Sequence, residues 1–229
     1  MNVILEFNGI PAIGKSTIAN KLSQSLKDSG IRCCSSFRRH SRYINYLEML
    51  CNISCWEVFF TSLRFTLSVK PHCQALYRSR KFVLLYKMYN DFLKDNNDCI
   101  LLMDQGVLQN TLSAINLGTM GNTVYLLKLI QFFSAKGISF IRIDCNADIE
   151  TVLSRLTNRK HGSSRFDRIS DGSAKQKLVY QKEQLSIIRS FFSQIYSKES
   201  VIQLDTCNTI EHNVNAITNH LSKSLTFNR

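Results

Sequence analysis

The sequence predicts an α/β fold built around a parallel sheet with helices on both faces. Short apolar segments alternate with longer segments in which apolar residues recur at helical spacing, and this alternation is typical of parallel α/β proteins. The run Ile100-Leu101-Leu102-Met103 contains no polar residue, as expected for a strand that is buried on both sides. A glycine-rich turn, GIPAIGKS, separates the first strand-like segment from the first helix-like segment.

The elements follow in chain order from the same two patterns, because apolar runs indicate strands and amphipathic segments indicate helices. The predicted strands are Val3–Phe7, Ile31–Ser35, Cys99–Met103, Ser139–Asp144 and Val201–Leu204. The predicted helices are Ser16–Asp28, one or two helices across Ile44–Leu67, Cys73–Lys94, Thr123–Lys136, Asp148–Thr157, Lys175–Tyr196 and Ile210–Leu225. The segment Asn158–Gly172 is polar, basic and interrupted by glycine, which predicts a mobile loop. No repeat or linker divides the chain, so we expect one domain over residues 1–229.

The chain carries a large excess of positive charge. Its 29 Lys and Arg residues against 17 Asp and Glu give a net charge of +12, while 44% of its residues are hydrophobic, which excludes a disordered tail. Such an excess indicates a polyanionic partner: nucleic acid, a membrane surface or phosphorylated small molecules. Two clusters are placed to contact a ligand, Arg38–Arg42 directly after the second strand and Arg155–Arg168 around the glycine-interrupted loop.

The cysteines and the apolar runs restrict the compartment. The eight cysteines include no CxxC pair and accompany no cluster of histidines, so we expect reduced thiols in the cytoplasm and no metal centre built from cysteines. The amino terminus lacks the basic flank and long apolar run of a signal peptide. No apolar run approaches the roughly 18 residues that a membrane-spanning helix needs, so no membrane association is predicted.

The turn after the first strand fits the phosphate-binding pattern GxxxxGK[ST]. Its residues are Gly9, Ile10, Pro11, Ala12, Ile13, Gly14, Lys15 and Ser16, followed by Thr17. The two glycines let successive backbone N–H groups point at phosphate oxygens, and the following helix adds its positive end. Lys15 would bridge the β- and γ-phosphates of a nucleotide, and the Ser16 hydroxyl would bind Mg²⁺. The alternative, a chance glycine turn before a helix, does not explain the complete motif.

A carboxylate is predicted to complete this site from the neighbouring strand. Asp104 follows Cys99–Met103 directly, and the carboxyl ends of parallel strands meet at the edge of the sheet where ligands bind. Asp104 would hold Mg²⁺ and its waters or accept a proton from the acceptor. The alternative role is to cap the next helix.

Arginines are predicted to stabilise the transferred phosphoryl group. Arg155 and Arg159 are four residues apart, and Arg165 and Arg168 follow in the loop. Planar guanidinium groups offset the charge that develops on phosphate oxygens in a closed site. A solvated basic face is the alternative.

The order of these features resembles the thymidylate kinase and deoxynucleoside kinase group of P-loop kinases over nearly the whole chain. Four stretches carry the resemblance: FNGIPAIGKST, LLMDQG, RLTNRKHGSSRFDR and LDTCNTIEHNVNAI. The resemblance implies a three-layer fold with a five-stranded parallel sheet of order 2-3-1-4-5, with ATP and Mg²⁺ as cofactors. It also implies an arginine-rich lid at about 158–172, with Arg155 and Arg159 as the arginines before the lid and Arg165 within it, a helical acceptor-side insertion at about 43–96, and a homodimer as one possible assembly.

The sequence departs from this group at the acceptor side. The Asp-Arg pair of the group is Asp104-Gln105 here, and an acidic residue followed by Pro is replaced by Arg38-Arg39-His40. The resemblance nominates Arg64 in FFTSLRF, with Arg80 as an alternative, to bind the acceptor together with Arg38 and Arg39.

The sequence thus predicts an ATP-dependent phosphotransferase that acts on a nucleotide or another small anionic acceptor. Two alternatives remain open: a kinase that acts on a polynucleotide end, and a regulator that binds nucleotides without turnover.

Overall fold

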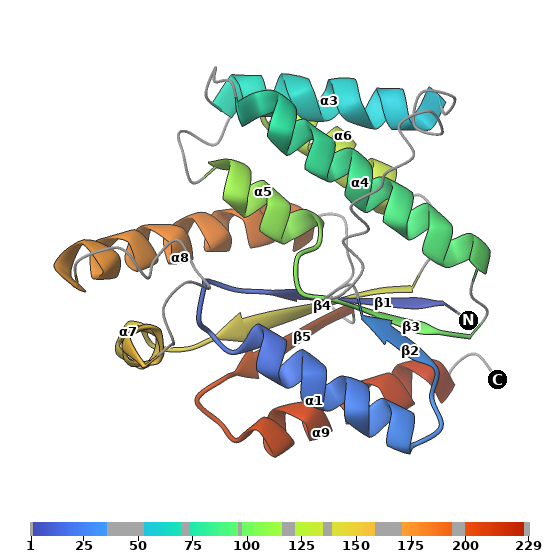
Figure 1. Ribbon diagram of the computed structural model, residues 1–229, viewed down its shortest axis with the longest axis vertical. Coiled ribbons are helices and arrows are strands. Elements are labelled where there is room, and N and C mark those ends of the chain that lie inside the picture. Colours follow the sequence, from blue (N-terminus) through green and yellow to red (C-terminus); the bar gives the residue numbers. More distant parts are fainter. Residues whose placement is uncertain are drawn as a thin grey trace.

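The chain forms a five-stranded parallel sheet with the order β2-β3-β1-β4-β5 (Figure 1). The computed structural model describes residues 2–35, 53–69, 74–95, 98–115, 122–134, 139–158, 171–193 and 200–226. The strands are β1 (Val3–Asn8), β2 (Cys33–Ser35), β3 (Ile100–Met103), β4 (Ser139–Asn146) and β5 (Val201–Asp205). The predicted fold class and strand order are confirmed.

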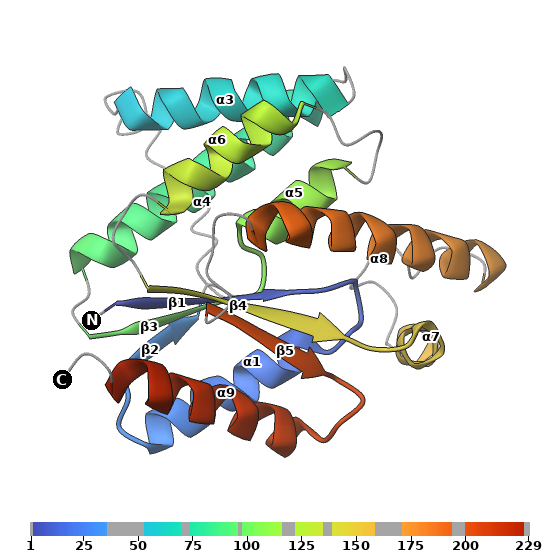
Figure 2. The same ribbon diagram turned by 180° about the vertical axis from the view of Figure 1, so that it is seen from behind.

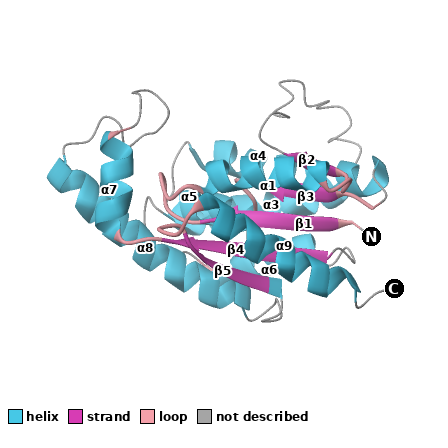
Figure 3. Cartoon of the chain, turned by 90° about the horizontal axis from the view of Figure 1, so that it is seen from below, coloured by secondary structure: helices cyan, strands magenta, loops and turns pink. Residues whose placement is uncertain are grey.

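Helices cover both faces of the sheet and make a three-layer structure (Figures 1 and 2). One face carries α1 (Lys15–Asp28) and α9 (Ile210–Thr226), which lie across the strands in Figure 3. On the other face are α3 (Ile53–Val69), α4 (Gln74–Asp95), α5 (Val107–Ile115), α6 (Thr123–Ser134) and α8 (Asp171–Ser193). Helix α7 (Ile149–Thr157) lies beyond the carboxyl end of β4. No helix in the described ranges is long and apolar enough to cross a membrane.

The hydrophobic core extends through the sheet into both helical layers. Strand β1 is buried at every position, because it lies in the middle of the sheet between β3 and β4. Its odd-numbered side chains, Val3, Leu5 and Phe7, are apolar, but the other face of the strand changes from apolar Ile4 to polar Glu6 and Asn8. Buried polar groups in a central strand need partners, and these are described with the site below.

The structure differs from the sequence prediction most at helices α5 and α8. Helix α5 was not among the predicted helices; it has nine residues, fewer than the window of about 11 residues over which periodicity identifies a helix. Helix α8 begins at Asp171, which gives the last two residues of the predicted lid to a helix. The predicted lid residues 159–170 lie outside the described residues.

Candidate functional site

The glycine-rich turn forms a tight loop between the end of β1 and the start of α1. A Cβ on Gly9 would lie 3.0 Å from the carbonyl oxygen of Cys145 in β4, so only glycine lets the loop leave β1 this close to its neighbour. Gly14 has φ 103° and precedes α1, and no side chain caps that helix. The first amides of α1 therefore face outward at the end of the loop, as an anion-binding helix terminus requires.

The side chain of Lys15 lies across this loop. Its Nζ donates hydrogen bonds to the carbonyl oxygens of Gly9 at 2.9 Å and Ile10 at 3.1 Å. The ammonium is thereby held against the first residues of the loop, so the side chain crosses from the end of the loop to its start. Of the other predicted loop residues, Ile10, Ala12 and Ile13 are buried, Pro11 is half-buried and Thr17 is exposed.

The structure brings Ser16 and Asp104 together, although 88 positions separate them. The Ser16 hydroxyl donates to Oδ2 of Asp104 at 2.8 Å. The second carboxylate oxygen, Oδ1, is buried without a hydrogen-bond partner among the described residues. A hydroxyl and a carboxylate are the hard oxygen ligands that Mg²⁺ prefers, so these two residues fit a magnesium ion.

Asp104 does not cap helix α5. The amide of Leu108 in the first turn of α5 donates instead to Oε1 of Glu6 at 2.8 Å. Glu6 is fully buried, and burial raises the pKa of its carboxyl to about 7, against the opposing effects of the α5 amides and Arg142. The carboxylate of Asp104 is therefore directed to the loop and that of Glu6 to the helix.

Arg155 ties the loop to the connection between β5 and α9. Its Nη1 donates to the carbonyl oxygen of Ile13 at 3.0 Å and to Oγ1 of Thr206 at 3.2 Å, and its Nη2 donates to the carbonyl oxygen of Thr206 at 2.6 Å. The guanidinium also lies next to Gly14. Arg155 is thus adjacent to the loop, where these hydrogen bonds hold the backbone; its role toward a phosphoryl group stays a prediction.

The other predicted arginines are not brought to the loop by the described structure. Arg38, Arg39, Arg159 and Arg165 lie outside the described residues. Arg64 is exposed on α3, which Figures 1 and 2 show as the helix farthest from the sheet.

Arg80 is exposed on α4. The aromatic residues of α3 differ in burial: Phe65 is buried, whereas Trp56 and Phe60 stack on each other at 5.7 Å between ring centroids and are exposed.

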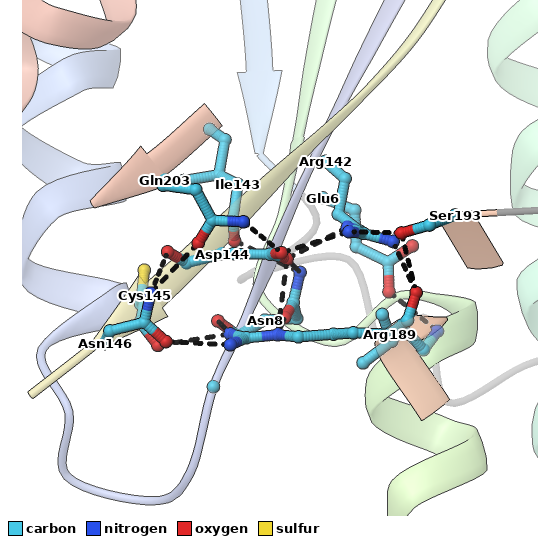
Figure 4. Close-up of polar contacts among 12 residues, drawn as sticks. Glu6, Asn8, Arg142, Ile143, Asp144, Cys145, Asn146, Arg189, Ser193 and Gln203 are labelled. Atoms are coloured by element: carbon cyan, nitrogen blue, oxygen red, sulfur yellow. Dashed lines mark hydrogen bonds and ion pairs between the residues drawn. The ribbon is translucent and has the colours of Figure 1, made fainter. Parts of the chain in front are cut away.

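A buried polar cluster behind the loop was not identified from the sequence (Figure 4). Asp144 accepts from Nδ2 of Asn8 at 2.7 Å and from Nη2 of Arg142 at 3.1 Å. Arg189 of α8 donates to Oδ1 of Asn8 at 2.9 Å and to Oδ1 of Asn146 at 2.7 Å. Its Nη2 also reaches the carbonyl oxygens of Cys145 at 3.2 Å and Asn8 at 3.4 Å. Helix α8 therefore fixes Asn8, the residue that directly precedes Gly9.

The sequence does contain a signal for this cluster. In SFIRIDCN the residues Arg142, Asp144 and Asn146 alternate with Ile143 and Cys145, and alternation in a strand places the polar residues on one face. A fully covered strand should be apolar on both faces, so a polar face on it predicts buried partners. The partner Arg189 on α8 could not be found in this way, because nothing local in the sequence connects it to β4.

Comparison with known proteins supports the fold. No family model matches the chain, and a search of curated proteins gives no significant match. Two solved structures of deoxyadenosine kinase from M. mycoides are similar to it, one with bound dATP and one with the products dCMP and a flexible dCDP. Each is 17% identical and matches 97% of this chain, covering 100% and 99% of the kinase, with TM-scores of 0.54 and 0.50. The chain therefore shares the fold of these kinases.

Proposed function

We propose that the chain is an ATP-dependent phosphotransferase that transfers the γ-phosphate of ATP to a nucleotide or a nucleoside. The observation that carries this proposal is the arrangement of Lys15, Ser16 and Asp104 around one loop: an ammonium over the loop and a hydroxyl–carboxylate pair beside it. The fold shared with deoxyadenosine kinase supports a kinase of this kind, as does the net charge of +12.

Different groups of the loop would bind different parts of a triphosphate. The backbone N–H groups of the loop, to which Pro11 contributes none, and the open amino terminus of α1 would bind phosphate oxygens. Lys15 would exchange its bonds to the loop carbonyl oxygens for bonds to the β- and γ-phosphates. Because the ammonium already lies over the loop, little rearrangement is needed.

Ser16 and Asp104 would hold Mg²⁺, whose charge supports the phosphates during transfer. Asp104 would also orient the hydroxyl of the acceptor, or accept its proton, at the carboxyl edge of β3. Arg155 keeps the loop in place through Ile13, so that the phosphates stay fixed while the acceptor attacks.

The proposal is tested by substituting Lys15. We expect Lys15→Ala to lower turnover by about 100-fold or more, as the loss of one charged donor to a transition state does. Lys21→Ala is the matched control, because Lys21 is an exposed lysine of the same helix. The assay follows ATP consumption with a panel of nucleosides, nucleoside monophosphates and sugars. Full turnover by Lys15→Ala would contradict the proposal.

One observation favours a second candidate, a regulator that binds nucleotides without turnover. Gln105 follows Asp104 where the resembling group has an arginine for its acceptor. Tight ATP binding without consumption in the presence of any acceptor would support the regulator. A kinase that acts on polynucleotide ends is distinguished by turnover with oligonucleotides and by affinity that falls steeply with salt.

A further inference from the structure

Glu6 is a buried carboxylate that the proposed chemistry does not use. It lies in the middle of β1, in the centre of the sheet, with none of its surface exposed. Only one of its two oxygens has a direct hydrogen-bond partner among the described residues: Oε1 accepts from the amide of Leu108, whereas Oε2 has none. An apolar side chain would occupy the same place without the penalty of burying an acid.

The Glu6 carboxyl group packs against the backbone of Gly106. A Cβ on Gly106 would overlap the Glu6 carboxyl group, and its three nearest neighbours would all be atoms of that group, closer than the 3.0 Å that real Cβ atoms keep. The backbone of Gly106 does not have a positive φ, so its conformation alone does not require glycine. The end of a glutamate side chain is flexible in general, but complete burial and the bond to Leu108 leave this one no space to withdraw.

The carboxylate therefore sits inside the turn that carries Asp104. In the sheet, Glu6 pairs with Met103, the residue directly before Asp104. On the far side of Asp104, Glu6 contacts the turn at Gly106 and binds α5 at Leu108. Both ends of the segment that projects Asp104 toward Ser16 are thus held by one residue, the first by the backbone of Glu6 and the second by its side chain.

We propose that Glu6 is a positioning residue that, through Gly106 and the first turn of α5, holds Asp104 in the orientation in which it meets Ser16. This inference rests on the proposed function, because the orientation of Asp104 matters only if Ser16 and Asp104 hold a metal ion beside a nucleotide. It extends the proposed function by assigning a role to a residue that would touch neither the metal ion nor the nucleotide.

The experiment measures nucleotide affinity rather than turnover. The affinity of the full chain for ATP is determined by fluorescence titration in excess Mg²⁺ and again in EDTA, and the ratio of the two affinities is the magnesium coupling. We expect Glu6→Ala and Gly106→Ala each to lower this coupling by about tenfold or more, as loss of a group that orients a metal ligand does. The affinity in EDTA should stay within about threefold of wild type, because the loop and Lys15 are untouched.

Two further proteins separate positioning from general loosening of the core. Leu5→Ala removes a fully buried side chain of the same strand that points to the opposite face, so it should lower stability but keep the coupling. The double variant Glu6→Ala/Gly106→Ala should recover the stability that Gly106→Ala loses, because the overlap is removed, but it should not recover the coupling. If Glu6→Ala fails to fold, Glu6→Asp replaces it, since a side chain shorter by one methylene cannot reach both contacts.

The possible results each decide the matter. Wild-type coupling in both Glu6→Ala and Gly106→Ala overturns the inference, and so does an equal loss of affinity in EDTA and in Mg²⁺, which would indicate a structural role only. A wild-type protein that binds no ATP under either condition overturns the proposed function as well. That result is recognised from the wild type alone, before any variant is compared.

Discussion

Arg189 is the residue through which helix α8 holds the start of the phosphate loop, and replacing it with methionine tests that connection. The guanidinium is mostly buried, with 16% of the side chain exposed, and it lies 3.4 Å from the Asp144 carboxylate. Burial lowers the pKa of Arg189, an effect that the negative charge of Asp144 opposes. Methionine keeps the apolar stem but removes the charge and every donor.

The expected loss of stability follows from these contacts. The two short bonds, to Asn146 at 2.7 Å and to Asn8 at 2.9 Å, are hydrogen bonds from a charged group, each with a net value of about 1.5–3 kcal/mol. Removing one member of a buried ion pair costs about 3–5 kcal/mol, but Asp144 keeps Arg142 as a partner. We therefore expect the free energy of unfolding to fall by about 3–5 kcal/mol, equivalent to a Tm lower by roughly 6–20 °C in a chain of this size.

Urea unfolding followed by circular dichroism gives this free energy, and fluorescence titration of the folded variant gives its ATP affinity. Lys182→Met is the matched control: Lys182 is an exposed residue of the same helix that makes one hydrogen bond, to the carbonyl oxygen of Ala147 at 3.1 Å, and its loss should cost about 1 kcal/mol or less. ATP should bind more weakly to Arg189→Met, because Asn8 directly precedes the loop. A free energy within about 1 kcal/mol of wild type would refute the reasoning.

Two other predictions concern single side chains of the site. The pKa of Glu6 is about 7 in the folded state instead of 4.5, so the native state holds this proton more tightly than the unfolded chain does. The protonated carboxyl therefore adds about 3 kcal/mol to the free energy of unfolding below pH 4.5, and this contribution is lost as the pH rises through 7. In Glu6→Gln this decline between pH 5 and 8 should disappear from urea unfolding curves; parallel profiles for the two proteins would show that another group is responsible. Arg155→Lys should weaken ATP binding by about tenfold, since a lysine cannot span Ile13 and Thr206, whereas Lys175→Met, which breaks an exposed ion pair with Glu150, should leave the titration unchanged.

The fold could be predicted from local patterns because its central strands β1 and β3 are covered on both faces. A short run without polar residues, such as Ile100–Met103, predicts a strand in the middle of a sheet, because only there are both of its faces buried. The phosphate loop is also local, since its glycines, lysine and serine are contiguous and lie between a strand and a helix. Asp104 could be predicted as its partner because parallel strands end at a common edge.

The remainder of the site depends on contacts between distant segments. Glu6 and Gly106 are 100 positions apart, and neither residue type indicates the other. Arg189 lies on a helix whose sequence is that of an ordinary amphipathic segment. Only the packing of α8 over the ends of β1 and β4 brings Arg189 within hydrogen-bond distance of Asn8 and Asn146. Helix α5 was missed because its nine residues are too few for a helical period to stand out.

One face of the sheet changes its chemistry along the strands, and this change connects stability with function. On the face covered by α5 and α8, Ile4 and Phe140 pair in the amino half of the strands, whereas Glu6 pairs with Arg142, and Asn8 with Asp144, in the carboxyl half. Apolar residues at the latter positions would avoid the penalty of burying charge. Asn8 directly precedes the glycine-rich loop, and Glu6 contacts the turn after Asp104 at Gly106, so the groups that reduce the stability of the core are the ones that fix these two segments. Substitutions that stabilise this half should therefore loosen the site.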